Sequence, residues 1–165
     1  MTEKKSAEEA EEIYQSGIRY YEGDGVEQSF EEAAKLFLQA AEEGHAIAQW
    51  FLASCYLLGL GVARDTDETF RWYKQSAEAG YAPAQFGLGT CYMIGQSVKT
   101  DHKAAFSWFL KAAEGGNSDG QYQTGYCYEH GYGVAEDKEQ AKSWYEKAAE
   151  QGNNWAIHAL KQLKG

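Results

Sequence analysis

Apolar positions along this chain recur every 36 residues through four successive copies. The clearest recurrences are a tyrosine, an alanine, a glycine and a valine, at Tyr20, Tyr56, Tyr92 and Tyr128; Ala41, Ala77, Ala113 and Ala149; Gly44, Gly80, Gly116 and Gly152; and Val26, Val62, Val98 and Val134. No insertion or deletion interrupts the series, so positions 36 residues apart are equivalent, and each such set is called a column. Self-similarity at a fixed period of this length is the signature of a repeat protein.

The spacing of recurring residues within each copy predicts two helices, called helix A and helix B. In the second copy helix A is expected over residues 46–58, with a stripe at helical spacing made of Ala48, Leu52 and Tyr56. Helix B is expected over residues 66–79, and its recurring stripe is Thr69, Trp72, Tyr73, Ser76 and Ala77. The aromatic side chains of this stripe are expected in the core rather than around a ligand.

The expected helix ends carry capping residues. The residues directly before helix B share one column, which is Ser29, Asp65, Asp101 and Asp137. A side-chain oxygen there can accept hydrogen bonds from the free N–H groups of the first turn. The glycine column that begins with Gly44 follows helix B, where a left-handed residue is needed. Ser6 and Glu9 give the same start signal to the first helix.

Stacking of the copies explains how such short helix pairs become stable. A single pair cannot bury both of its faces, whereas neighbouring copies bury them against each other. The last segment departs from the repeat, and it is expected to cover the end of the fourth copy with Trp155, Ala159, Leu160 and Leu163. The prediction is an all-α solenoid and a single domain over 1–165, with repeats at about 8–45, 46–81, 82–117 and 118–153 and a capping helix at 154–164.

Charge and hydropathy narrow the range of partners. Residues 1–45 hold 12 acidic and 4 basic side chains, and residues 46–165 hold 13 and 11. The net charge of −10 disfavours nucleic acid, while the acidic N-terminal quarter either steers a basic partner or is simply a solvated face. No apolar run is long enough for a bilayer, and no signal peptide is visible. A cytoplasmic monomer that does not bind membranes is therefore expected, with reduced cysteines.

The repeat motif points to a known family. It reads A-Q-x-x-L-G-x-x-Y-x-x-G-x-G-V-x-x-D and then x-x-A-x-x-W-Y-x-K-A-A-E-x-G, and it resembles the Sel-one-like repeat (SLR) family of the tetratricopeptide class over residues 12–153. The resemblance implies a right-handed superhelix whose A helices line a concave surface, and an adaptor role in protein complexes. Some members look like immunity proteins encoded beside toxins. This chain departs from the motif at Ser97, which replaces a loop glycine, and at Ala53, which replaces a glycine where helices approach closely.

A binding surface is expected where equivalent positions differ between copies. The columns of residues 47, 51, 54 and 58 form one stripe on helix A, apart from the packing stripe. The candidate protein-binding residues are Ile18, Glu22, Ile47, Phe51, Leu58, Ile94, Tyr126 and His130. An apolar centre with polar flanks suits an amphipathic helix or an extended peptide. The alternative is that these side chains fill gaps between repeats.

Catalytic, metal and cofactor sites are not expected. Cys55, Cys91 and Cys127 share one column, too far apart in stacked helices for disulfides, and are expected to be half-buried free thiols. The histidines lack metal-ligand spacing. Cys127 and His130 are three residues apart, but no third orienting group is evident. The Gly-x-Gly sequences lie in turns between helices, without a nucleotide-binding context.

These observations favour a non-catalytic scaffold that binds a protein or peptide in a groove lined by A helices. The main alternative is an immunity or antitoxin protein, whose acidic N-terminal quarter masks a basic toxin. A thiol-dependent hydrolase and an engineered repeat protein without a cellular partner are weaker alternatives. A hydrolase would need a reactive Cys127, and the irregular surfaces argue against an engineered protein.

Overall fold

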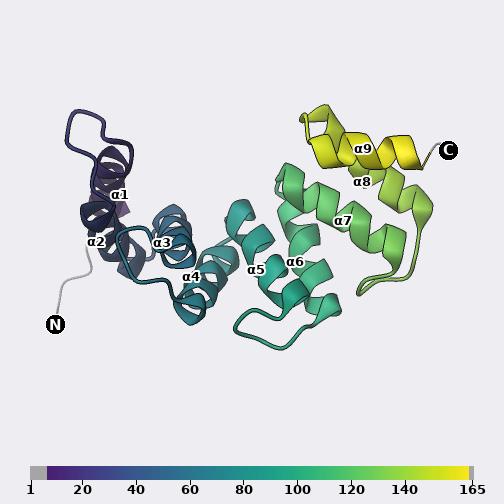
Figure 1. The fold of residues 1–165 in the computed structure, drawn as a ribbon, viewed down its shortest axis with the longest axis horizontal. Coiled ribbons are helices and arrows are strands. Elements are labelled where there is room, and N and C mark those ends of the chain that lie inside the picture. The colour runs from purple at the N-terminus through teal and green to yellow at the C-terminus, as the bar shows by residue number, and fades with distance from the viewer. Residues whose placement is uncertain (1–6, 164–165) are drawn as a thin grey trace. The chain divides into compact units, whose positions relative to one another are not determined.

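The computed structural model describes residues 7–163, and these residues form nine helices and no strand. The helices are α1 (Ala7–Glu22), α2 (Phe30–Glu42), α3 (Ala46–Leu58), α4 (Thr66–Glu78), α5 (Ala82–Ile94), α6 (His102–Glu114), α7 (Ser118–His130), α8 (Lys138–Glu150) and α9 (Asn154–Gln162) (Figure 1). Helices α1, α3, α5 and α7 are the A helices, and α2, α4, α6 and α8 are the B helices. The all-α solenoid with a C-terminal helix is confirmed.

The capping residues explain why the helices begin and end where they do. The Asp65 carboxylate accepts hydrogen bonds from the backbone N–H groups of Asp67 and Glu68. Ser29, Asp101 and Asp137 act in the same way, so the predicted N-caps of the B helices are confirmed. The glycines that follow the B helices have φ between 83° and 92°, as predicted for Gly44, Gly80, Gly116 and Gly152. The start signal at Ser6 lies outside the described residues.

Residues Met1–Gly80 and Tyr81–Gly165 form two compact units, called unit 1 and unit 2. Unit 1 contains α1 to α4, and unit 2 contains α5 to α9. Each unit therefore holds two complete repeats, and unit 2 also holds the last helix. That the four repeats form a single domain stays a prediction.

Aromatic packing holds the core of unit 1 together. Phe37 of α2 is fully buried, and its ring lies 5.0 Å from that of Phe51, centroid to centroid. Tyr14 and Tyr21 of α1 surround the same two rings. A Cβ added to Gly17 would lie 2.7 Å from a Phe37 ring carbon, so the glycine is what allows α1 to approach α2.

Unit 2 repeats this arrangement with a polar addition. Tyr145 of α8 is fully buried against Gly125 of α7, and its hydroxyl donates a 2.6 Å hydrogen bond to the Glu129 carboxylate. Burial, together with this hydrogen bond, raises the pKa of Tyr145 above its usual range. The equivalent pair in the preceding repeat is Phe109 and Met93, which needs no hydrogen bond. The same position in the core of unit 2 is thus filled by an apolar pair in one repeat and by a hydrogen-bonded pair in the next.

A glutamine on the A helix ties it to the end of the preceding B helix. The side-chain amide of Gln49 donates to the carbonyl oxygen of Ala41 at 3.1 Å, and that of Gln121 donates to Ala113 at 3.3 Å. The Gln121 amide oxygen also accepts a 2.8 Å hydrogen bond from Gln151. Among the described residues, the buried amide oxygen of Gln49 has no such partner. An unpaired buried acceptor of this kind destabilises the fold.

The last helix covers the fourth repeat, although not with every residue expected. Ala156 is buried against Tyr145, and Ala159, Leu160 and Leu163 pack at the same cluster. Trp155 was expected to join them, but 70% of its surface is exposed. It lies in the first turn of α9 and is not among the residues packed on this cluster. The expectation for Trp155 is therefore wrong.

Ser97 is the one residue other than glycine with a positive φ, 59°, in the described part of the chain. It stands in the column of Gly61 and Gly133, which have φ of 70° and 74°. A Cβ in this left-handed region costs roughly 1 kcal/mol relative to glycine. This positive φ is the reason why a serine is expected to be less stable than a glycine at this loop position.

The Tyr145–Glu129 hydrogen bond gives a first prediction. Tyr145→Phe should lower the free energy of unfolding by about 1 kcal/mol, and Glu129→Met by about 1–3 kcal/mol, because the second change leaves a buried hydroxyl unpaired. The double variant recreates the Phe109 and Met93 pair of the preceding repeat, so its loss should be smaller than the sum of the two. Urea unfolding of all four proteins measures this coupling, and strictly additive losses would contradict it.

A second prediction concerns the unpaired amide oxygen of Gln49. Ala79 follows Gln49 by the same 30 residues that separate Gln151 from Gln121. Ala79→Gln should therefore supply the missing donor and raise the free energy of unfolding by about 0.5–1.5 kcal/mol. The matched control is Ala79→Met, which adds a side chain of similar length without a donor. Equal stability of the two variants in chemical denaturation would rule out the proposed hydrogen bond.

Candidate protein-binding face

A groove in unit 2 lies on the A-helix face, between α5, α7 and α9. It has a volume of about 460 Å³ and is lined by Phe86 of α5, Asp119, Tyr122 and Gln123 of α7, and Trp155 of α9. The exposed indole of Trp155 belongs to this groove. Three alternate helices, α5, α7 and α9, each contribute one aromatic side chain to this groove.

The core holds the aromatic walls of the groove in place. The Tyr122 ring lies 5.6 Å from that of the fully buried Tyr145, and Phe86 lies 6.0 Å from the buried Phe109. Burial raises the pKa of Tyr122, so its hydroxyl stays neutral at physiological pH. These contacts fix two of the three rings before any ligand arrives, which lowers the entropy lost on binding.

A hydrogen bond between α7 and the N-cap residue of α9 fixes the polar edge of the groove. The side-chain amide of Asn153 donates to the Asp119 carboxylate at 2.9 Å, while its own oxygen caps α9 by accepting from Ala156. Unit 1 has the equivalent contact, since His45 caps α3 and its Nε2 lies 2.8 Å from a carboxylate oxygen of Glu11. Hydrogen bonds from Gln15 and from His45 lower the pKa of Glu11. The column of Glu11 and Asp119 thus joins successive repeats.

Two rings of this groove, Phe86 and Tyr122, come from an aromatic column that is not among the predicted binding residues. An aromatic residue stands at the same position of all four A helices, as Tyr14, Trp50, Phe86 and Tyr122. This column lies one residue before that of Phe51, so the 36-residue step alone would have revealed it. The predicted binding positions are those that differ between copies, whereas an aromatic residue that recurs in every copy is typical of packing.

The candidate residues of unit 1 do not share one environment. Leu58, at the end of α3, is 64% exposed, and Glu22 is exposed at the end of α1. Ile18 and Ile47 are half-buried. Phe51 packs between the rings of Tyr14, Tyr21 and Phe37, as the gap-filling alternative describes. Leu58 is therefore the apolar candidate of this unit that is open to a partner.

The candidates of unit 2 lie beside the groove residues rather than among them. Tyr126 and His130 of α7 are brought together, with ring centroids 4.3 Å apart, and Tyr132 lies 5.9 Å from Tyr126. Ile94 is 62% exposed at the end of α5. None of the eight candidates lines the described groove of unit 2. Whether they contact a partner stays a prediction.

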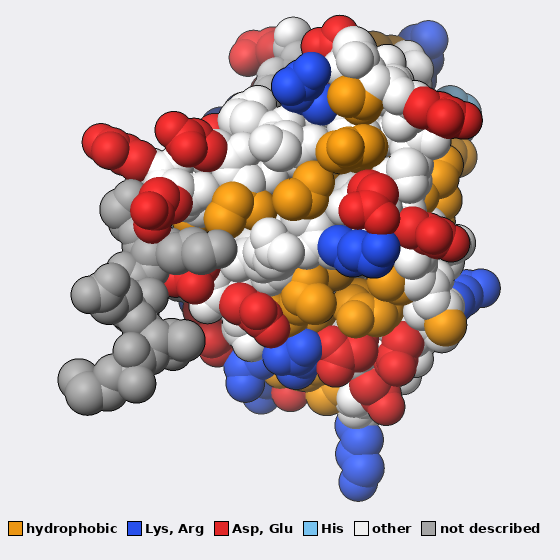
Figure 2. Space-filling model, turned by 90° about the vertical axis from the view of Figure 1, so that its left-hand side faces the viewer, with side chains coloured by type: hydrophobic (Ala, Val, Ile, Leu, Met, Phe, Trp, Pro, Cys, Tyr) orange, Lys and Arg blue, Asp and Glu red, His pale blue; other side chains and the backbone are white. Residues whose placement is uncertain are grey.

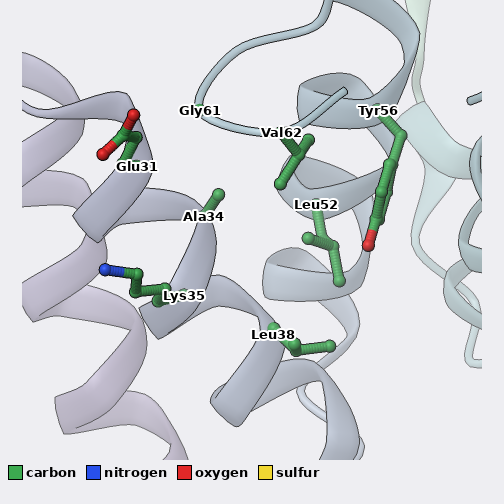
Figure 3. A pocket seen from close by; sticks show the side chains of 8 residues that line it. All are labelled: Glu31, Ala34, Lys35, Leu38, Leu52, Tyr56, Gly61 and Val62. Carbon is green, nitrogen blue, oxygen red and sulfur yellow. The ribbon is translucent and has the colours of Figure 1, made fainter. Parts of the chain in front are cut away.

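A smaller cleft in unit 1 has few polar groups that point into it. It has a volume of about 250 Å³ and is lined by Glu31, Ala34, Lys35, Leu38, Leu52, Tyr56, Gly61 and Val62. Figure 3 shows Leu52 and Val62 pointing between α2 and α3, whereas the charged ends of Glu31 and Lys35 point away. Lys35 pairs with Glu32 at 2.6 Å. The cleft is a gap between two stacked repeats, and most of its lining is apolar.

The three cysteines are free and buried, with exposures of 1% for Cys55, 3% for Cys91 and 0% for Cys127, rather than half-buried as predicted. Burial raises the pKa of Cys55 and Cys91 to about 11 and that of Cys127 to about 12. A thiol protonated at neutral pH is a poor nucleophile.

The described residues contain no cluster of three metal-ligating side chains. Within the same residues, no helix has both the length and the apolarity needed to cross a membrane.

The two units differ strongly in charge. Residues 1–80 hold 16 acidic and 7 basic side chains, for a net charge of −9, whereas residues 81–165 hold 9 and 8, for −1. Figure 2 shows the side of the molecule on which α1 and α2 lie, where acidic side chains are spread around the hydrophobic ones. Nearly all the net negative charge therefore belongs to unit 1.

Comparison with known proteins identifies the repeat. The Sel1 repeat family model matches four times, at residues 13–45, 46–81, 82–117 and 118–153. The chain belongs to the Sel1 repeat family. Sel1 repeat proteins are generally protein-interaction scaffolds and are typically non-catalytic.

Solved structures of other Sel1 repeat proteins are similar to this chain. A Sel1 repeat protein from Oxalobacter formigenes is 39% identical, with a TM-score of 0.86 over 95% of this chain and 46% of that one. The protective antigen c5321 of uropathogenic Escherichia coli, which displays an SLR fold, is 35% identical, with a TM-score of 0.85 over 94% and 35%. This Sel1 repeat chain thus spans less than half the length of either protein.

A more distant solved structure shares the fold alone. Cysteine-rich protein B of Helicobacter pylori is 23% identical, with a TM-score of 0.65 over 80% of this chain and 98% of that one. Among curated proteins, the search found no match.

The different environments of Phe51 and Leu58 give a third prediction. Phe51→Ala should lower the free energy of unfolding of this Sel1 repeat protein by about 2–3 kcal/mol, because it removes a half-buried ring that packs on Phe37. Leu58→Ala should change it by less than about 0.5 kcal/mol, because the side chain is mostly exposed. Thermal and urea unfolding compare the two variants directly. Similar losses for both would mean that Leu58 is a packing residue as well.

Proposed function

We propose that this Sel1 repeat protein is a non-catalytic scaffold that binds a protein or peptide on its A-helix face, chiefly in the groove of unit 2. The observation that carries the proposal is the Trp155 indole, 70% exposed above a groove that already holds Phe86 and Tyr122. Exposed aromatic residues that line a concavity are characteristic of binding hot spots, because they bury much area with little loss of freedom.

The shape of the groove favours a short segment of a partner rather than a flat protein surface. Its volume of about 460 Å³ accommodates one or two side chains. The groove is lined by α5, α7 and α9, so an extended segment could lie across these helices and present alternate side chains. Ile94, Tyr126 and His130 lie on the same helices and are proposed to contact the flanks of the bound segment.

The charge of unit 1 supports a second candidate, an immunity-type role in which this unit binds a basic toxin. Its net charge of −9 would speed the association of such a partner. Binding of this kind must weaken as salt screens the charges. Toxin binding that is insensitive to salt would contradict the charge argument.

The test of the main proposal selects random displayed peptides on the whole chain, and then measures their affinities for two variants. Trp155→Ala should weaken binding at least tenfold, because it removes the exposed wall of the groove. The control is Tyr132→Ala, which removes another exposed aromatic residue of unit 2 that does not line the groove.

Circular dichroism should show unchanged helix content for both variants, because the two side chains are on the surface. Failure to select any peptide, or equal affinities for the Trp155→Ala variant and the wild type, would overturn the proposal.

A further inference from the structure

The side chains of the groove in unit 2 indicate what kind of group it accepts. We infer that the groove recognises a cationic side chain, lysine or arginine, of the bound segment. This inference rests on the proposed function and makes it more specific.

The groove offers aromatic faces and acceptors instead of an aliphatic surface. Its lining is three aromatic rings, one carboxylate and one carboxamide, with no Leu, Ile, Val or Met. The faces of aromatic rings carry partial negative charge and attract cations within about 6 Å. Asp119 is the one charged residue of this lining. Three rings with an acidic neighbour suit an ammonium or guanidinium group better than an apolar group.

The Asp119 carboxylate is both positioned and available. Asn153 donates to its Oδ1 at 2.9 Å, which leaves Oδ2 without a hydrogen bond among the described residues. The side chain is exposed at the first turn of α7. Gln123, one turn further along α7, adds a carboxamide oxygen that can accept from a second N–H group. An apolar occupant would cover these acceptors and leave them unpaired, at a cost in affinity.

Three other tryptophans, all on B helices, pair with a cation from within the chain. Arg71 lies 4.2 Å from the ring centroid of Trp72, Lys111 lies 3.9 Å from that of Trp108, and Lys147 lies 3.9 Å from that of Trp144. No described cation covers the ring of Trp155, and no lysine or arginine lines its groove. The face of Trp155 is thus open to a cation supplied by a partner.

The first test uses small amides as probes of the groove. The Trp155 indole N–H signal, identified by its loss in Trp155→Phe, is followed by NMR as N-acetyl-arginine methylamide or N-acetyl-lysine methylamide is added. Their neutral counterparts, the citrulline and norleucine amides, are titrated in the same way. Each cationic probe should bind about tenfold more tightly than its neutral counterpart, a difference typical of a cation–π contact with a carboxylate. Equal affinities would overturn the inference.

Two variants that each remove one negative charge then locate the effect. Asp119→Asn keeps an oxygen that can accept from Asn153 but lacks the charge, and it should reduce the preference for the cationic probes severalfold, to the part that the aromatic rings supply. Glu150→Gln removes an exposed charge of α8 that does not line the groove, and it should leave the preference unchanged. A preference that Asp119→Asn leaves unchanged, or that Glu150→Gln reduces equally, would contradict the assignment to this groove.

The peptides selected on the whole chain separate this inference from the proposed function. If both hold, peptides that depend on Trp155 contain a lysine or arginine, and exchanging that residue for citrulline or norleucine weakens binding about tenfold. Trp155-dependent peptides that tolerate the exchange would overturn the cationic specificity and leave peptide binding in place. The absence of any Trp155-dependent peptide would overturn the proposed function itself.

Discussion

In three of the four repeats, the A helix lies close to its B helix because a glycine leaves room for a large ring. An added Cβ would lie within 2.8 Å of a ring carbon at Gly17, Gly89 and Gly125, facing Phe37, Phe109 and Tyr145. Three of the four repeats therefore place a buried ring directly against the backbone of the opposing helix. The rings that line the unit 2 groove rest on the same buried residues, since Phe86 contacts Phe109 and Tyr122 contacts Tyr145. The candidate binding surface is thus the outer layer of the packing that defines the repeat.

The backbone could be predicted from the sequence because its signals are local and repeated four times. The expected bounds of helix A in the second copy are those of α3, and helix B ends one residue before the position expected. The capping columns that include Asp65 and Gly80 act as predicted, because capping depends on a few neighbouring residues.

The candidate site was harder to predict, because the exposure of a side chain depends on the neighbouring repeat. Phe51 and Leu58 lie on one predicted stripe, yet Phe51 meets the aromatic residues of α1 and α2 while Leu58 extends beyond them. Trp155 is one more apolar residue of the capping helix in the sequence, yet it is exposed while Ala156, Ala159 and Leu160 pack on the cluster around Tyr145. The Asp119–Asn153 hydrogen bond joins residues 34 positions apart, a relation that no single-helix pattern displays.

The three buried cysteines have a consequence for following local motion. Each of the second, third and fourth repeats carries one thiol at the same position of helix A, and each is shielded from solvent. An alkylating reagent can reach such a sulfur only when the surrounding helices separate. The rates at which Cys55, Cys91 and Cys127 become modified therefore report how often each of these repeats opens. The opening of the second, third and fourth repeats can therefore be followed separately at native cysteines, without the introduction of any label.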